Sequence, residues 1–381
     1  DPALLIADEP TTALDVTIQA EVLDLLYELG EARGLAVLLI THDLSIIAGF
    51  THRVLVMYGG RVVERAGTSE LYSAPLHPYT GLLMRSIPTL DQTEDRLIAI
   101  SGSPPEPASR PSGCGFHPRC PFAEDSVCTT EQPPLLEISA NGGASRATAC
   151  VRIDEIDPAE FLASSPSSKV ESATIQEDVL VEVEQLTKSF KIKGEGLVGS
   201  DTIVAVEDVT LELKRGAALG IVGESGSGKS TLARCLLHLI VPTSGTVRVG
   251  GQDLAELSSR EMRQLRPQMQ MIFQDPASSL DPRMSVGRIL AEPLRIHGLW
   301  GTAGYDEQAL EDLLDLVQLP KDSLSRFPHE FSGGQRQRVA IARALAVRPS
   351  LLVCDEAVSA LDVSVRSSIL NLLADLRAEF G

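Results

Sequence analysis

Apolar and polar positions follow two patterns along the chain, one typical of strands and one typical of helices. Short apolar runs bounded by polar residues occupy 1–9, 35–40, 217–222 and 348–356. Runs of this kind are typical of parallel strands that are buried on both faces. Residues 18–29 carry apolar side chains at helical spacing directly after the first run. Strands that alternate with helices predict an α/β fold with a mostly parallel core sheet.

Other segments predict further layers. Residues 53–57 and 61–64 flank Tyr58-Gly59-Gly60 and predict a β-hairpin, followed by a helical tail over 68–83. An antiparallel β subdomain is predicted from strand-like runs at 179–183, 204–213 and 246–249, and 269–274 predicts one more short strand. An α-helical subdomain is predicted from helical spacing at 286–297, 307–316 and 333–346.

The first and last parts of the chain repeat one another. Residues 1–9 read DPALLIADE and residues 348–356 read RPSLLVCDE, and Ala13-Leu14-Asp15 has its counterpart in Ala360-Leu361-Asp362. The offset is constant, since 355 − 8 and 362 − 15 both give 347. A repeat of this period predicts a duplicated domain. We expect two incomplete copies in tandem, the first without its front and the second without its back, and hence a fragment of a longer chain.

Composition sets the expected boundaries between these copies. We assign 1–87 to the C-terminal part of the first copy and 88–152 to a separate region that contains four cysteines. Residues 153–178 are acidic, rich in Ser and Ala and without apolar periodicity, which predicts a flexible linker. The second copy takes the remaining residues, 179–381.

The strongest chemical signal is GESGSGKST at 223–231, which lies between a predicted strand and a predicted helix. The G-x-x-x-x-G-K-S spacing is that of a phosphate-binding loop, whose backbone N–H groups and helix N-terminus surround an anion. In such a loop Lys229 reaches the outer phosphates, and the hydroxyl of Ser230 binds Mg²⁺. The nucleotide-binding residues are therefore Gly223, Ser225, Gly226, Ser227, Gly228, Lys229, Ser230 and Thr231.

Polar residues that follow the predicted strands supply candidate catalytic groups. Asp355 is placed to hold Mg²⁺, and Glu356 to polarise the water that attacks the γ-phosphate. Asp8 and Glu9 take the same parts in the first copy. Gln274 closes the strand at 269–274 and could contact both Mg²⁺ and the water, although a lone Gln is weak support.

A second anion-binding helix start is predicted at FSGGQRQR, residues 331–338. Gly333 and Gly334 leave the N-terminus of the following helix open, and Ser332 supplies a hydroxyl beside Gln335. His42 follows the apolar run at 35–40. A histidine in this position could also be an ordinary core residue, and only the surrounding motifs make it a candidate functional residue.

Together these motifs resemble the ATP-binding-cassette (ABC) ATPases, in order and in spacing. The resemblance identifies 223–231 as Walker A, Asp355-Glu356 and Asp8-Glu9 as Walker B, Gln274 as the Q-loop and Ser332–Gln335 as the signature motif. It implies a P-loop NTPase fold in which ATP lies between two domains, and it makes Glu356, Gln274, Glu9 and His42 the catalytic residues. It also implies D-loop roles for Asp15 and Asp362, with Phe190 as the candidate aromatic for adenine. Because each site lacks its partner half, we expect this chain alone to bind ATP weakly and to hydrolyse it slowly or not at all.

Longer stretches narrow the resemblance to importers of the oligopeptide and dipeptide permease type. They are QDPASSLDPR at 274–283, EPLRIHG at 292–298, LYSAPLHPYT at 71–80 and GCGFHPRC at 113–120. The resemblance implies two integral-membrane permease subunits and an extracytoplasmic solute-binding protein as partners. It implies a peripheral location at the cytoplasmic face of the cell membrane, and peptides or related small solutes as cargo.

Four cysteines, Cys114, Cys120, Cys128 and Cys150, are separated by five, seven and twenty-one residues. Four thiolates suit an iron–sulphur cluster or Zn²⁺, and the resemblance places them in the C-terminal region of oligopeptide ATPases, where a cluster is plausible. No C-x-x-C pair is present, which argues against a typical zinc ribbon. Free structural thiols are the alternative.

Charge and hydropathy exclude other classes of protein. The net charge is −19 and there is no dense block of Lys and Arg, so nucleic acid is not an expected partner. No run of 18 apolar residues predicts a membrane span. Two alternatives to an import ATPase remain: a soluble ABC ATPase associated with nucleic acid or ribosomes, and a binding module without turnover.

Overall fold

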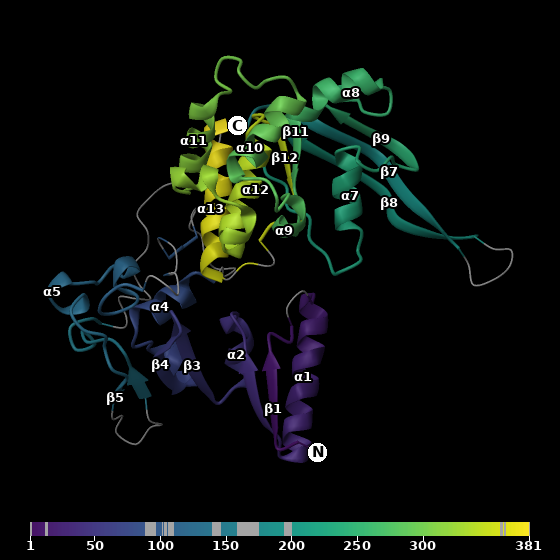
Figure 1. The fold of residues 1–381 in the computed structure, drawn as a ribbon. Helices are drawn as coiled ribbons and strands as arrows, with labels where there is room; N and C mark the ends of the chain where they lie inside the picture. Colours follow the sequence, from purple (N-terminus) through teal and green to yellow (C-terminus); the bar gives the residue numbers. More distant parts are fainter. Residues whose placement is uncertain are drawn as a thin grey trace. The chain divides into compact units, whose positions relative to one another are not determined.

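The structure is a computed structural model, in which contacts divide the chain into two compact units (Figure 1). It describes residues 2–11, 14–87, 97–100, 102, 105, 110–138, 146–157, 175–193, 200–358, 361 and 363–380. Unit 1 comprises Asp1–Thr12, Ile18–Val170 and Asp362–Asn371, and unit 2 comprises Ala13–Thr17, Glu171–Leu361 and Leu372–Gly381. Among the described residues, no helix is both long enough and apolar enough to cross a bilayer.

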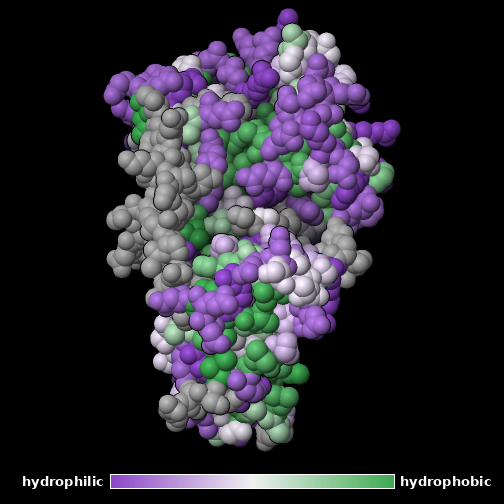
Figure 2. All heavy atoms as spheres, turned by 90° about the vertical axis from the view of Figure 1, so that its left-hand side faces the viewer, coloured by the Kyte–Doolittle hydropathy of each residue, from purple (hydrophilic) through white to green (hydrophobic). Residues whose placement is uncertain are grey.

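Unit 1 begins with a strand–helix–strand segment. Strand β1 (Leu4–Asp8) pairs in parallel with β2 (Ala36–Ile40), and α1 (Val16–Arg33) connects them. The predicted strands and the predicted helix are thus confirmed, but not their burial. Leu4, Ile6, Leu38 and Ile40 are between 45% and 59% exposed, because this two-stranded ladder is covered on one face only. Apolar side chains also reach the surface in patches on the face drawn in Figure 2.

The rest of unit 1 packs around an antiparallel sheet of order β3-β4-β6-β5. The predicted hairpin is confirmed as β3 (Arg53–Tyr58) and β4 (Arg61–Gly67), with Gly59 and Gly60 at positive φ in the turn. Its core includes Val54, Val56 and Phe116. The other elements of this unit are α2 (Leu44–Phe50), α3 (Thr68–Ser73), α4 (Pro78–Arg85), α5 (Asp125–Cys128), β5 (Leu136–Ile138) and β6 (Arg146–Thr148).

The helical tail predicted for 68–83 is in fact two short helices. Helix α3 ends at Ser73, and Ala74 has φ −154° and ψ 77° at its C-terminus. Pro75 explains the break, because the residue before a proline is driven out of the helical region. Pro78 then occupies the first turn of α4, where its missing N–H costs nothing.

Unit 2 combines an antiparallel sheet of order β10-β9-β7-β8 with a parallel pair, β11 and β12. The predicted antiparallel layer and the helical layer are confirmed, and the strands β7 and β8 of the layer are longer than expected. The elements are β7 (Val179–Lys193), β8 (Ser200–Lys214), α7 (Lys229–Leu236), β9 (Ser244–Val249), β10 (Gln252–Asp253), α8 (Ser259–Leu265), β11 (Met269–Ile272), α9 (Pro276–Ser279), α10 (Val286–Ile296), α11 (Glu307–Leu316), α12 (Gly333–Leu345), β12 (Leu351–Cys354) and α13 (Val363–Phe380).

The strand predicted for 217–222 is wrong. These residues have no regular secondary structure, and Val222 is 93% exposed. An apolar run becomes a parallel strand only where neighbouring strands take up its backbone N–H and C=O groups. In the described part of the chain, β11 and β12 pair with each other and no strand pairs with 217–222.

Candidate nucleotide-binding site

The loop at 223–231 has the backbone that a phosphate-binding loop needs. Gly226 and Gly228 have φ of 79° and 94°, and Gly228 caps the start of α7. A Cβ atom at Gly228 would lie 2.1 Å from the carbonyl oxygen of Ala205, so only glycine fits there. The sequence GSGKS therefore fixes how the chain turns from the loop into the helix.

The ammonium of Lys229 lies within this loop. Its Nζ donates hydrogen bonds to the carbonyl oxygens of Gly223, at 2.7 Å, and Glu224, at 2.8 Å. The cation is therefore held at the start of the loop, on the side of residues 223 and 224. When a triphosphate is bound, the same ammonium can donate to the phosphate oxygens in place of these carbonyls.

Asp355 joins the loop to the parallel strands. Its backbone N–H donates to the carbonyl of Ile272 at the end of β11, and its carboxylate accepts a 2.8 Å hydrogen bond from Oγ of Ser230. The side chain is buried, with 6% exposure. A hydroxyl and a carboxylate in contact are two oxygen ligands of the type that Mg²⁺ prefers.

Glu356, the next residue, meets two further predicted side chains. Nε2 of Gln274 donates to its carboxylate at 2.7 Å, and Nζ of Lys229 lies 4.0 Å from Oε1 of Glu356. Gln274 reaches this point because β11 and β12 are parallel, so that residues after both strands meet at one edge. Glu356 has φ 46°, a left-handed conformation that is uncommon for this residue type and is often found at functional sites.

The first-copy residues form a smaller cluster in unit 1. Nδ1 of His42 and Oε1 of Glu9 are 3.0 Å apart, and the backbone N–H of Glu9 donates to the carbonyl of Ile40. Asp8 ends β1 with its side chain exposed. Glu9 has the same φ as Glu356, 46°. The structure therefore brings His42 to Glu9, as a shared site requires.

The predicted second helix start is also present. Ser332 caps α12, where its Oγ accepts from the N–H of Gln335 while its own N–H donates to Oε1 of Gln335. Gly333 has open space where a Cβ would stand, and Gly334 follows it in the first turn. Asp15 precedes α1, Asp362 lies outside the described residues, and Phe190 is a partly exposed residue of β7.

The residues that gather at the loop fit ATP with Mg²⁺. The loop supplies one ammonium and a helix N-terminus for phosphate, and Ser230 with Asp355 supplies oxygens for the metal ion. Gly228 leaves no side chain in the turn itself. These contacts are observed between residues separated by up to 125 positions.

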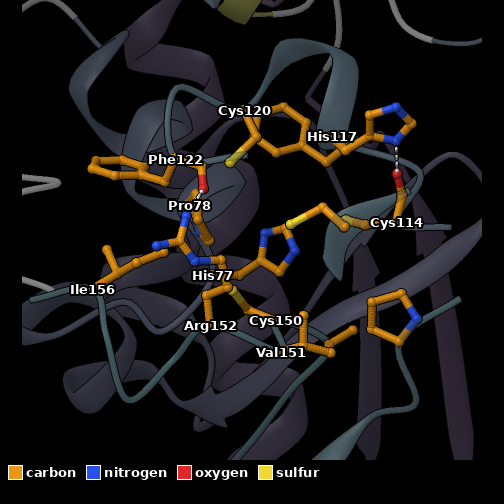
Figure 3. A pocket seen from close by; sticks show the side chains of 14 residues that line it. His77, Pro78, Cys114, His117, Cys120, Phe122, Cys150, Val151, Arg152 and Ile156 are labelled. Atoms are coloured by element: carbon orange, nitrogen blue, oxygen red, sulfur yellow. Dashed lines mark hydrogen bonds between the residues drawn. The ribbon is translucent and has the colours of Figure 1, made fainter. Parts of the chain in front are cut away.

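The four cysteines of unit 1 meet around one small cavity of about 20 Å³, room for about one water molecule. They come from separate segments, and His77, Phe122 and Arg152 also line the cavity (Figure 3). Burial raises the pKa of three of these thiols: that of Cys114, that of Cys120 to about 12, and that of Cys150 to about 11. The neighbouring thiols add to each shift.

The expected iron–sulphur cluster or Zn²⁺ is not supported by this geometry. Within the described ranges, no three His, Cys, Asp or Glu side chains are placed to hold a metal ion. The prediction that these cysteines lie together is nevertheless correct.

Two buried polar residues of unit 1 escaped the sequence interpretation. The fully buried carboxylate of Glu64 accepts hydrogen bonds from the N–H groups of Leu76 and His77, with Arg146 3.8 Å away. Burial also lowers the pKa of His77 to about 3, so its ring is neutral and accepts from the N–H of Tyr79. No periodicity in 61–67 marks Glu64 as a buried position.

Two stretches of this chain match known families. Residues 206–359 match the family model described as ABC transporter, and residues 63–128 match the one described as Oligopeptide/dipeptide transporter, C-terminal region. The first match contains the loop and the Gln274 strand end, and the second contains three of the four clustered cysteines, Cys114, Cys120 and Cys128. The two matches support the resemblance seen in the motifs, the first to the ABC ATPases and the second to the oligopeptide/dipeptide type.

Individual relatives are similar over the whole of this chain. The Oligopeptide transport ATP-binding protein OppD of Mycobacterium bovis is 46% identical over 388 residues, which cover 100% of this chain and 62% of that protein. The Glutathione import ATP-binding proteins GsiA of Salmonella paratyphi A and Escherichia coli are 40% and 39% identical over 383 residues, with 53% of each covered. The chain therefore spans between about half and two thirds of the length of these relatives.

Proposed function

We propose that this chain is the ATP-binding and ATP-hydrolysing subunit that energises import of peptides or related small solutes through a membrane ABC permease. The carrying observation is the hydrogen bond from Ser230 to Asp355, which joins the phosphate-binding loop to the strand-end carboxylates. The relatives named above, an oligopeptide transport ATP-binding protein and a glutathione import ATP-binding protein, support the cargo class.

The proposed chemistry divides among five side chains. Lys229 binds the outer phosphates, which places a positive charge where the negative charge develops during phosphoryl transfer. Ser230 and Asp355 hold Mg²⁺, which when bound neutralises phosphate charge and orients the leaving group. Gln274 orients Glu356 through its 2.7 Å hydrogen bond, and Glu356 accepts the proton of the attacking water.

We also propose that the chain contains parts of two ATPase copies in tandem. Helix α1 spans 16–33 and α13 spans 363–380, so the two 18-residue helices differ by the same 347 positions as the motifs. Each helix comes after a strand whose C-terminal end lies at an Asp-Glu pair, and both glutamates have φ 46°. The proposed regions are 1–87, 88–152, 153–178 as a linker, and 179–381.

In this arrangement each site draws on both copies. Gly223–Thr231, Gln274 and Asp355-Glu356 form half of one site, and Ser332, Gly333, Gly334 and Gln335 complete the other, which also takes Glu9 and His42. Asp15 and Asp362 are the proposed D-loop residues, and Phe190 stacks on adenine.

The proposed partners are two integral-membrane permease subunits and an extracytoplasmic solute-binding protein. The proposed location of this chain is the cytoplasmic face of the membrane. A soluble ABC ATPase without permeases is the alternative, and co-purification with integral-membrane subunits distinguishes the two.

The test is Glu356→Gln, with Glu256→Gln, an exposed glutamate of the same unit, as the matched control. Loss of a general base costs about 10²- to 10⁴-fold in rate. We expect the full-length protein assembled with its permease to keep ATP affinity and to lose ATP hydrolysis and solute uptake by at least about 100-fold. Hydrolysis by Glu356→Gln at the rate of the Glu256→Gln control would refute the proposal.

A further inference from the structure

Lys188 and Phe190 form a pair beside the phosphate-binding loop. They lie two residues apart on β7, so their side chains share one face of the strand. Nζ of Lys188 stands over the ring of Phe190, 5.0 Å from its centroid, and donates a 2.8 Å hydrogen bond to the carbonyl of Val241. The ammonium of Lys188 thus has two contacts, one with the carbonyl of Val241 and one with the face of the Phe190 ring.

The strand register places this pair close to the start of α7. On β8, Val206 pairs with Lys188 and Ile203 pairs with Phe190. The same stretch of β8 approaches the loop, because a Cβ at Gly228 would lie 2.1 Å from the carbonyl of Ala205 and 3.4 Å from Cγ2 of Val206. The pair and the loop therefore belong to one local surface of unit 2.

The Phe190 ring contacts Lys188 and is also partly exposed to solvent. An ammonium within about 6 Å of a ring centroid is attracted to the ring face, which restricts the ring to one orientation. Phe190 is still 37% exposed, so a substantial part of the ring remains accessible to solvent. A flat, electron-rich base can stack on exposed aromatic surface of this kind.

We propose that Lys188 is a positioning residue for the base of the nucleotide. It holds the Phe190 ring in the orientation that accepts the base, and it acts through the ring rather than on the phosphates. The inference rests on the proposed function, because it needs a nucleotide at the loop. Direct phosphate binding by Lys188 is the competing role, and comparison with a ligand that has phosphates but no base distinguishes the two roles.

The test compares nucleotide with a ligand that has no base. Lys188→Met removes the charge and keeps the length of the side chain. The matched control is Lys191→Met, at an exposed lysine of the same strand. Affinities for Mg–ATP and for Mg–tripolyphosphate are measured by calorimetry on the whole 381-residue chain. We expect Lys188→Met to weaken ATP about two- to fivefold, the range of an exposed cation–π contact, and to leave tripolyphosphate unchanged.

Two further variants separate positioning from a structural role. Lys188→Arg retains a cation over the ring and is expected to restore ATP affinity. In the Phe190→Ala background, Lys188→Met is expected to have no further effect on ATP, since the residue acts through the ring.

Several results would overturn the inference. Equal loss of ATP and tripolyphosphate affinity would show that Lys188 binds phosphate, and unchanged ATP affinity would show that the pair is unrelated to the base. A fall in the unfolding midpoint that Lys188→Arg does not restore would assign a purely structural role. Equal affinity of the unsubstituted chain for ATP and for tripolyphosphate would show that the base makes no contact, which would overturn this inference while leaving phosphate binding, and so the proposed function, in place.

Discussion

Gly228 offers the sharpest test of how the loop is built, because a matched glycine stands two residues away. Both Gly226 and Gly228 have left-handed φ angles, 79° and 94°. A Cβ at Gly226 would meet nothing within 4 Å, whereas one at Gly228 would lie 2.1 Å from the carbonyl oxygen of Ala205. Alanine at either position thus carries the same backbone penalty, and only one adds a collision.

The magnitudes follow from these contacts. The left-handed conformation costs about 1–2 kcal/mol for a residue with a Cβ. At Gly228 the Cβ must also move more than about 1 Å from a backbone atom, and such overpacking adds about 1–3 kcal/mol. We expect Gly226→Ala to lower the free energy of unfolding of unit 2 by about 1–2 kcal/mol and Gly228→Ala by about 2–5 kcal/mol.

Denaturant unfolding of the two variants, with Mg–ATP affinity measured in parallel, provides the assay. If the loop escapes the collision by moving away from β8, the cost will appear in ATP affinity instead, and Gly228→Ala will bind ATP more weakly than Gly226→Ala. Equal stability together with equal ATP affinity for the two variants would refute the reasoning, since it would mean that the close approach to Ala205 does not exist in solution.

Two predictions concern unit 1. Burial lowers the pKa of His77 to about 3, so between pH 6.5 and pH 3 the unfolded chain binds a proton at this residue and the folded chain does not. The contribution of His77 to the free energy of unfolding is therefore complete above pH 6.5. It is lost as the pH falls towards 3, at about 1.4 kcal/mol per pH unit. His77→Asn, which keeps an acceptor for the N–H of Tyr79, should flatten this dependence in urea titrations, and an unchanged pH profile would contradict the burial. Because the pKa of Cys120 is about 12 and that of Cys150 about 11, iodoacetamide at pH 8 should modify both at least about 100-fold more slowly in the folded chain than in urea, as followed by mass spectrometry. Rapid labelling of Cys120 without unfolding would count against the cavity.

Sequence patterns predicted the elements whose partners are close in the chain. The hairpin at 53–67, the helices α10 to α12 and the loop before α7 were all predicted because turn glycines and helical spacing act locally. The meeting of Gln274 with Glu356 could also be predicted, since both follow parallel strands. These are features that a motif records directly.

What the patterns could not predict depends on distant partners. The run 217–222 is as apolar as 351–354, yet only the second finds a strand to pair with. Burial of Glu64 depends on N–H groups of Leu76 and His77, which no periodicity in 61–67 records. The spacing of four cysteines predicted that their thiols lie together, but the raised pKa of Cys120 depends on its burial, which the spacing does not record.

The left-handed glutamates have a consequence for stability. Glu9 and Glu356 occupy a backbone conformation that glycine or asparagine adopts more readily, so selection for thermal tolerance alone would favour replacing both. Glycine at either position should therefore raise the free energy of unfolding, while removing a carboxylate that the proposed ATP hydrolysis requires.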